Sequence, residues 1–91
     1  MESGLVWKVI GSVAATLTMF SFVPQILKIS RSKSVNDLSV VTLVQFTAGV
    51  SLWLIYGLHL RNYIIIVANS VTLLSLLILL ALFIFFRGKN K

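Results

Sequence analysis

Three long stretches of the chain carry no charge, and charged residues separate them. Asp, Glu, Lys and Arg are absent from windows of 19, 23 and 25 residues, which lie between Lys8 and Lys28, between Asp37 and Arg61, and between Arg61 and Arg87. A transmembrane helix needs about 20 mostly apolar residues, and in lipid a helix satisfies its own backbone polar groups. The pattern predicts an all-α membrane protein with helices over residues 5–29, 39–59 and 62–86, in a single domain of residues 1–91.

The composition agrees with a membrane protein. Apolar residues make up 58% of the chain and charged residues 11%, against about 45–50% and 25% in soluble domains. This excludes an ordinary soluble enzyme and a disordered chain. Cysteine is absent, so no disulfide or thiolate metal site is expected. The first residues, MESGLVWK, include Glu2 instead of a basic region, so the first helix is expected to be retained and not cleaved as a signal peptide.

The net charge of +6 is distributed unevenly. Two cations, Lys8 and Arg61, fall on one side of the predicted membrane, and six fall on the other: Lys28, Arg31, Lys33, Arg87, Lys89 and Lys91. This asymmetry predicts a cytoplasmic C-terminus and an N-terminus outside. Cations spread in this way form no basic face, so no nucleic acid partner is expected. All copies should share one orientation in the lipid.

Small and polar residues recur along one face of each predicted helix. In the first helix they are spaced by three or four positions, as Gly11, Ala14, Thr18, Ser21 and Gln25. In the second they are Thr42, Gln45, Gly49 and Trp53, with Phe46 beside them; in the third, Asn69, Thr72 and Ser75. Such faces allow close helix packing, and they are also expected to border a polar path, which Thr18, Ser21, Gly49 and Thr72 would line.

Trp53 and Asn69 are predicted to reach a similar depth. Trp53 lies five residues before the outer end of its helix, about 7–8 Å below it, and Asn69 lies seven residues after the start of the next helix, about 10 Å below it. An indole that stacks on a sugar ring and an amide that bonds to its hydroxyls form a plausible sugar site. The alternative for Asn69 is an interhelical hydrogen bond.

Ionisable residues are missing from the middle of all three predicted spans. Proton or ion coupling usually requires an intramembrane ionisable group, so passive transport of a neutral solute is expected. No nucleophile–base pair or metal-ligand cluster occurs in the sequence, which predicts no enzyme activity, no cofactor and no metal. Three helices cannot enclose a path alone, and copies of one orientation close most simply as a parallel C2 dimer.

Three segments resemble the helices of the SemiSWEETs, the bacterial half-size relatives of SWEET sugar transporters in the PQ-loop group. They are Gly11-Ser12-Val13-Ala14-Ala15 with Phe22-Val23-Pro24-Gln25-Ile26, then Gly49-Val50-Ser51-Leu52-Trp53-Leu54-Ile55-Tyr56-Gly57, then Ala68-Asn69-Ser70-Val71-Thr72-Leu73. The resemblance implies a parallel homodimer, giving a 3+3 transporter, with helix 3 packed between helices 1 and 2. It also implies alternating-access transport of small mono- or disaccharides across the bacterial inner membrane.

The resemblance assigns roles to individual residues. It implies a sugar site at Trp53 and Asn69, bending of helix 1 at Pro24 and Gln25, and an extracellular gate at Tyr56. We expect Arg61 to join that gate and Phe46 to belong to an intracellular gate. Close relatives often carry Arg and Asp shortly after the gate tyrosine, where this chain has Leu60 and Asn62, so a salt bridge there cannot form in the same way.

Two other functions stay open at this stage. The chain could carry another neutral solute such as an amino acid, as other PQ-loop proteins do. It could also be a structural subunit of a membrane complex, without transport of its own.

Overall fold

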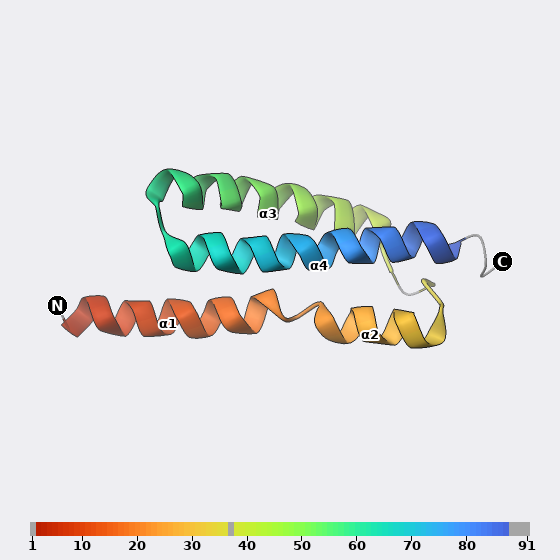
Figure 1. Cartoon of the computed structure of the whole chain (residues 1–91), viewed down its shortest axis with the longest axis horizontal. Coiled ribbons are helices and arrows are strands. Elements are labelled where there is room, and N and C mark those ends of the chain that lie inside the picture. The colour runs from red at the N-terminus through yellow and green to blue at the C-terminus, as the bar shows by residue number, and fades with distance from the viewer. Residues whose placement is uncertain (1, 37, 88–91) are drawn as a thin grey trace.

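The computed structural model describes residues 2–36 and 38–87, which form four helices: α1 (Glu2–Met19), α2 (Val23–Ser32), α3 (Val40–Leu60) and α4 (Tyr63–Arg87). Helices α1 and α2 run end to end, so the fold has three rods (Figure 1). Three segments are long and apolar enough to cross a membrane, namely Gly4–Ser32, Val40–Leu60 and Tyr63–Arg87. The predicted all-α architecture with three membrane helices is confirmed. Asp37, Lys89 and Lys91 lie outside the described residues, and the single domain of residues 1–91 stays a prediction.

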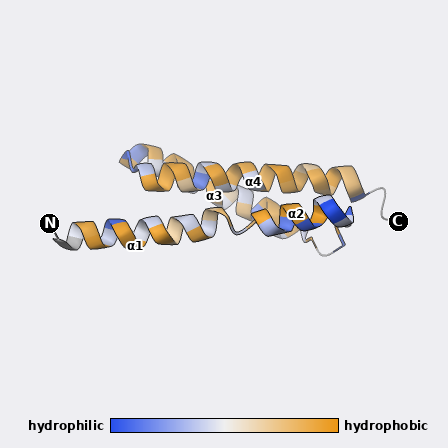
Figure 2. Cartoon of the chain, turned by 60° about the horizontal axis from the view of Figure 1, so that its bottom comes forward, coloured by the Kyte–Doolittle hydropathy of each residue, from blue (hydrophilic) through white to orange (hydrophobic). Residues whose placement is uncertain are grey.

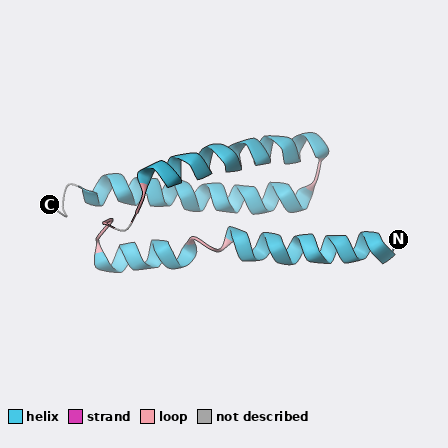
Figure 3. Ribbon diagram, turned by 180° about the vertical axis from the view of Figure 1, so that it is seen from behind, coloured by secondary structure: helices cyan, strands magenta, loops and turns pink. Residues whose placement is uncertain are grey.

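The first rod differs from the continuous helix that hydropathy predicts over residues 5–29. It is interrupted at residues 20–22, a break that Figure 3 shows as a short loop. Pro24 lies in the first turn of α2; its ring excludes the carbonyl of the residue four positions earlier, Phe20, and it has no N–H to donate to it. The interruption therefore lies upstream of Pro24.

Local hydrogen bonds satisfy much of the backbone at this break. The carbonyl of Thr18 accepts from the Ser21 amide at 3.1 Å and from the Ser21 hydroxyl at 2.7 Å. The Val23 amide donates to Phe20 O at 3.2 Å, and the Ile26 amide donates to Phe22 O at 3.0 Å. Interrupted helices are tolerated at membrane depth when the released polar groups find such partners.

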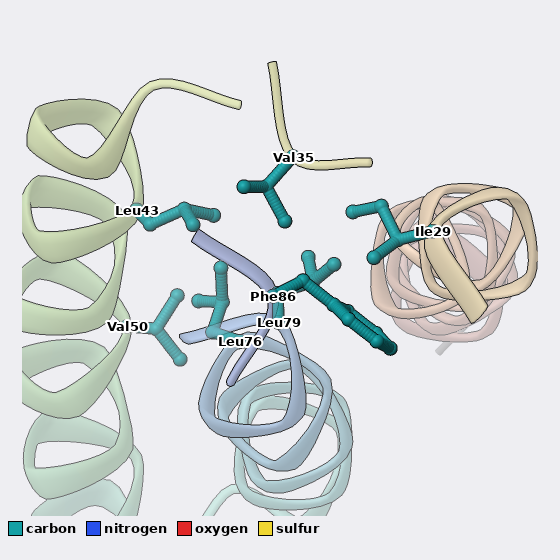
Figure 4. Close-up of a cluster of buried hydrophobic side chains, with 7 residues drawn as sticks. All are labelled: Ile29, Val35, Leu43, Val50, Leu76, Leu79 and Phe86. Atoms are coloured by element: carbon teal, nitrogen blue, oxygen red, sulfur yellow. The ribbon is translucent and has the colours of Figure 1, made fainter. Parts of the chain in front are cut away.

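Helix α4 lies between the other two rods. It packs against α3 on one side and against α1 and α2 on the other, so that its backbone separates α3 from the first rod. Its buried core joins α4 to α2, α3 and the loop after α2 through seven side chains (Figure 4): Ile29, Val35, Leu43, Val50, Leu76, Leu79 and Phe86. The arrangement with the third transmembrane helix in the middle is thus confirmed.

A tight turn joins α3 to α4. The Asn62 amide donates to Gly57 O at 3.0 Å and the Arg61 amide donates to Leu58 O at 3.2 Å, the two bonds of a Schellman motif. Arg61 adopts a left-handed conformation at φ 55°. The Asn62 side chain then accepts from the Ile65 amide at 3.2 Å and begins α4. This turn holds α3 and α4 antiparallel.

Most of the outer surface is apolar. Large apolar side chains such as Leu17, Val41 and Leu52 are more than two-thirds exposed, and hydrophobic colouring covers most of α4 in Figure 2. An apolar surface of this extent indicates contact with lipid or with another protein chain. The protein is therefore a membrane protein.

Candidate functional site

Asn69 lies in a groove between α1 and α4, which we call the Asn69 groove. Its volume is about 490 Å³, and its lining residues are Trp7, Lys8, Gly11, Ala15, Thr18, Asn62, Ile64, Ile65, Ala68, Asn69 and Thr72. Asn69 is half-buried and donates through Nδ2 to the Ile65 carbonyl of its own helix at 2.8 Å. This bond is within one helix, so the interhelical hydrogen bond considered from the sequence is not formed within the described protomer.

Trp53 lies in a second groove along α3, which we call the Trp53 groove. Its volume is about 450 Å³, and its lining residues are Thr42, Gln45, Phe46, Gly49, Val50 and Trp53. The Trp53 side chain is 55% exposed, whereas tryptophan side chains in folded proteins are on average largely buried. Its ring meets Tyr56 edge to face, with centroids 5.8 Å apart. An apolar wall with few polar groups is typical of a small-molecule site.

Side-chain contacts link each groove to the rod on the other side of α4. Ile65 lines the Asn69 groove, and it also lies opposite Gly57 of α3. Phe46 lines the Trp53 groove and packs edge to face on Phe22, between α1 and α2, with ring centroids 5.5 Å apart. The Phe46 end of the Trp53 groove therefore reaches the first rod. We infer that both grooves open onto one side of the bundle, which we call the inner face.

Trp53 and Asn69 also lie at the same height along the bundle. A Cβ on Gly57 would be 2.6 Å from Ile65 Cγ2, so these two residues stand opposite one another. Because α3 and α4 are antiparallel, Trp53, four residues before Gly57, is level with Asn69, four residues after Ile65. Each is about 6 Å from the Gly57–Ile65 contact at 1.5 Å per residue.

The polar face predicted for the first helix is only partly realised. Gly11 and Thr18 line the Asn69 groove, but Ala15 takes the place expected for Ala14. Ser21 lies in the break and bonds to Thr18, and Gln25 lines a separate cavity of about 90 Å³ with Lys28, Ile29, Ser34 and Leu38. A spacing of three and four residues places side chains on one face only while the helix is continuous, and the break ends that continuity.

On the third helix, Thr72 lines the Asn69 groove while its hydroxyl donates to Ala68 O at 2.8 Å. Ser75 is buried and does not line that groove. Gly49 lines the Trp53 groove, and a Cβ there would meet no atom within 4 Å.

The residues expected at the gates lie at opposite ends of the grooves. Tyr56 is one turn from Trp53 toward the α3–α4 turn, and Arg61 forms that turn. Phe46 lies near the other end, where it packs on Phe22. Asn62 is engaged in starting α4. Phe46, Trp53, Tyr56 and Arg61 therefore follow one another along α3 toward the α3–α4 turn.

Sequence reasoning missed two residues that shape this region. Phe22 contacts Phe46 and so links the first rod to α3. In the sequence it stands out only as a member of the segment Phe22-Val23-Pro24-Gln25-Ile26. Gly57 allows α3 and α4 to approach closely. A glycine in an otherwise bulky apolar helix, near a tight turn, is a usable signal for close helix packing.

Comparison with known proteins identifies the family. The family model for the PQ loop repeat matches residues 6–66. The chain is 44% identical over 71 residues to the sugar transporter SemiSWEET of Leptospira biflexa, covering 78% of this chain and 84% of the relative. Relatives with this name are transporters and not enzymes.

Two crystal structures share the fold. One is of a bacterial homologue of SWEET transporters, with a TM-score of 0.84 and 28% identity, covering 89% of this chain and 98% of that one. The other is of SemiSWEET in the inward-open conformation, with a TM-score of 0.76 and 33% identity, covering 90% and 95%. The three-helix arrangement, the PQ loop repeat and the sequence identity agree: the chain belongs to the PQ-loop family and, within it, to the SemiSWEETs.

Proposed function

We propose that this chain is a passive, alternating-access uniporter of small neutral sugars. The observation that carries the proposal is the placement of Trp53 and Asn69 at one height along the bundle, each lining a groove. The exposed indole offers a stacking surface. The Asn69 amide, which uses one N–H within its helix, retains a second N–H and its carbonyl oxygen for sugar hydroxyls.

The functional unit in this proposal is a parallel C2 homodimer. In one protomer the inner face leaves Trp53, Gln45 and Thr18 exposed, and an amide exposed to lipid is costly. A second copy with the same orientation would cover this face and bring two Trp53 and two Asn69 side chains around one cavity. The site is incomplete without the partner copy.

The transport cycle in this proposal uses the break in the first rod. Pro24 and Gln25 begin α2 and would form the hinge, because the missing hydrogen bonds at residues 20–22 let α2 move relative to α1. Phe46 would close the cytoplasmic side, and Tyr56 and Arg61 the outer side. The unit would lie in the bacterial inner membrane, with the N-terminus outside and the C-terminus in the cytoplasm.

Transport in this proposal needs no gradient other than that of the sugar. Lys8 is the one charged side chain lining the two grooves, and it lies near the outer end of the Asn69 groove. The carboxylates Glu2 and Asp37 both fall outside the predicted spans. The predicted spans therefore hold no carboxylate that could take up and release a proton, as a proton-coupled transporter would require.

Trp53 fluorescence tests the binding site directly. The chain has two tryptophans, Trp7 and Trp53, and Trp7 also lines the Asn69 groove. A Trp7→Phe variant, which keeps an aromatic ring at that position, reports on Trp53 alone. Glucose and other neutral sugars should change its emission saturably in the purified dimer. In that background Asn69→Ala should weaken binding about fivefold or more, the effect of one lost hydrogen bond. A Trp53 signal that no sugar alters, or an affinity unchanged by Asn69→Ala, would place the site elsewhere.

A further inference from the structure

The outer end of the Asn69 groove lies beside the α3–α4 turn. Helices α1 and α4 run in the same direction away from this end (Figure 1). Lining positions on both sides of the groove are separated by three, four and three residues, namely Lys8, Gly11, Ala15 and Thr18 on one side and Asn62, Ile65, Asn69 and Thr72 on the other. Equal spacing on parallel helices indicates that Lys8 is level with Asn62, about 10 Å from Asn69 along the bundle. We call Trp7, Lys8 and Asn62, which share this end, the outer mouth.

Trp7 contributes an aromatic surface to the outer mouth. Its side chain is 69% exposed in the protomer. A tryptophan at headgroup level usually anchors a helix in the membrane interface, but Trp7 shares a helix face with Gly11 and Thr18, and all three line the groove. The indole is therefore available to stack on the C–H face of a sugar ring.

Lys8 is the charged member of the outer mouth. Within residues 2–36 and 38–87 its ammonium group forms no ion pair and no hydrogen bond. The nearest acidic residue in the sequence, Glu2, lies six residues earlier, about 9 Å away along the helix axis. A lysine that lines a groove without an anionic partner favours a ligand with a negative charge.

Asn62 adds hydrogen-bond donors beside this charge. Its Oδ1 atom accepts from the Ile65 amide at 3.2 Å, and the two N–H groups of its Nδ2 atom have no partner in the described part of the chain. Lys8 and Asn62 therefore both present donors to the groove. A carboxylate, which only accepts, complements these donors better than a neutral hydroxyl group does.

We propose that the outer mouth binds a sugar acid, a monosaccharide that carries a carboxylate, with its ring on Trp7 and its carboxylate on Lys8 and Asn62. The ligand would stay at the mouth, because the rest of the groove offers only neutral side chains and a carboxylate at membrane depth is costly. A bound sugar acid would therefore block the entry of neutral sugars. The block rests on the proposed sugar transport, whereas the binding does not.

Trp7 fluorescence in a purified Trp53→Phe dimer tests the binding. Glucuronate should change the emission saturably. Glucuronamide, which has the same ring without the charge, should bind about fivefold more weakly, the effect of one exposed ion pair. Acetate, which has the carboxylate without the ring, should leave the emission unchanged at the same concentrations. Glucuronate that leaves the Trp7 emission unchanged would overturn the proposal.

Variants of the outer mouth identify the groups that bind the carboxylate. Lys8→Gln should weaken glucuronate binding about fivefold, and Lys8→Arg should restore it. Asn62→Asp keeps an oxygen that can begin α4 but adds a repelling charge, so it should weaken binding further. Arg87→Gln removes a cation from the far end of α4 and is the matched control, with unchanged affinity expected. Equal affinities of wild type and Lys8→Gln would reject the site.

Glucose uptake by proteoliposomes tests the block. External glucuronate should inhibit uptake by the wild type more strongly than by Lys8→Gln, and it should not be taken up itself; uptake of glucuronate would overturn the block. Glucuronate binding without any sugar uptake would overturn the proposed function and leave the site standing. Trp7 emission that differs between phosphatidylglycerol and phosphatidylcholine nanodiscs, but does not respond to glucuronate, would assign the outer mouth to lipid headgroups instead.

Discussion

Gly57 sets the height at which α3 and α4 meet, and with it the heights of Trp53 and Asn69. Its missing side chain lets Ile65 approach to a distance that a Cβ could not share. The register then places the indole and the amide level with one another. Counting residues from the outer ends of the helices predicts the same depth, because helix rise is constant. The contact that fixes the register could not be predicted, since it depends on which faces of two helices meet.

Replacing Gly57 by alanine should destabilise the helix pair. The added Cβ would lie 2.6 Å from Ile65 Cγ2 and 3.4 Å from the Ile66 amide nitrogen, so α3 and α4 must separate. Overpacking of this kind costs about 1–3 kcal/mol, against a gain of about 1 kcal/mol in helix propensity. Thermal unfolding in detergent should show a lower Tm for Gly57→Ala than for wild type.

The same change at Gly49 is the matched control, because a Cβ there meets nothing within 4 Å. Gly49→Ala should therefore unfold at or above the wild-type temperature. Adding Ile65→Ala to Gly57→Ala removes the colliding methyl group, so the double variant should be more stable than the sum of the single effects predicts. Equal Tm values for Gly57→Ala and Gly49→Ala would contradict the proposed register.

Among the helices, the three membrane spans can be predicted from the sequence, whereas the break in the first rod is harder to predict. Length and hydropathy predict the spans, because a helix in lipid must be long enough and must satisfy its own backbone. Pro24 predicts a bend, but its ring excludes the carbonyl of Phe20, four residues earlier, so the break lies upstream of the proline. Within the break, the Ser21 amide and hydroxyl both donate to Thr18 O. Assignments that assume a continuous helix, such as Ser21 and Gln25 on one face with Thr18, fail because the break changes the direction in which the later side chains point.

Pro24→Ala should make the first rod more continuous. The alanine supplies the N–H that proline lacks, and its bond to the Phe20 carbonyl would favour the straight form by about 1 kcal/mol, or about fivefold in the equilibrium. If α2 moves against α1 during transport, the maximal uptake rate should fall by a similar factor while the affinity for sugar changes little. Sugar affinity from Trp53 fluorescence, together with uptake rates, would separate the two effects. An unchanged rate would argue against a hinge at this break.

For the whole molecule, the central point is that one protomer presents two half-sites on a single inner face. The Asn69 groove and the Trp53 groove are separate in the protomer, and in our proposal a second copy closes them into one cavity. The sequence indicates that a second copy is needed, because the predicted spans carry polar residues and three helices cannot enclose a polar path. The span that becomes α4 is the most apolar, with a mean hydropathy of 2.6 against 1.6 for each of the other two, but hydropathy does not identify contact partners, which tertiary packing sets. The position of α4 between the other rods could be expected only from the resemblance to the SemiSWEETs.

Passive uniport is tested by the uptake of radiolabelled sugar into proteoliposomes without any pH, ion or voltage gradient. The internal sugar concentration should rise to the external value and stop there. The rate should be the same with and without an imposed proton gradient. Trp53→Ala should reduce it to the level of protein-free liposomes, and Asn69→Ala should lower it about fivefold or more, while the dimer persists. No uptake of any mono- or disaccharide, or accumulation above the external concentration that a protonophore abolishes, would contradict it.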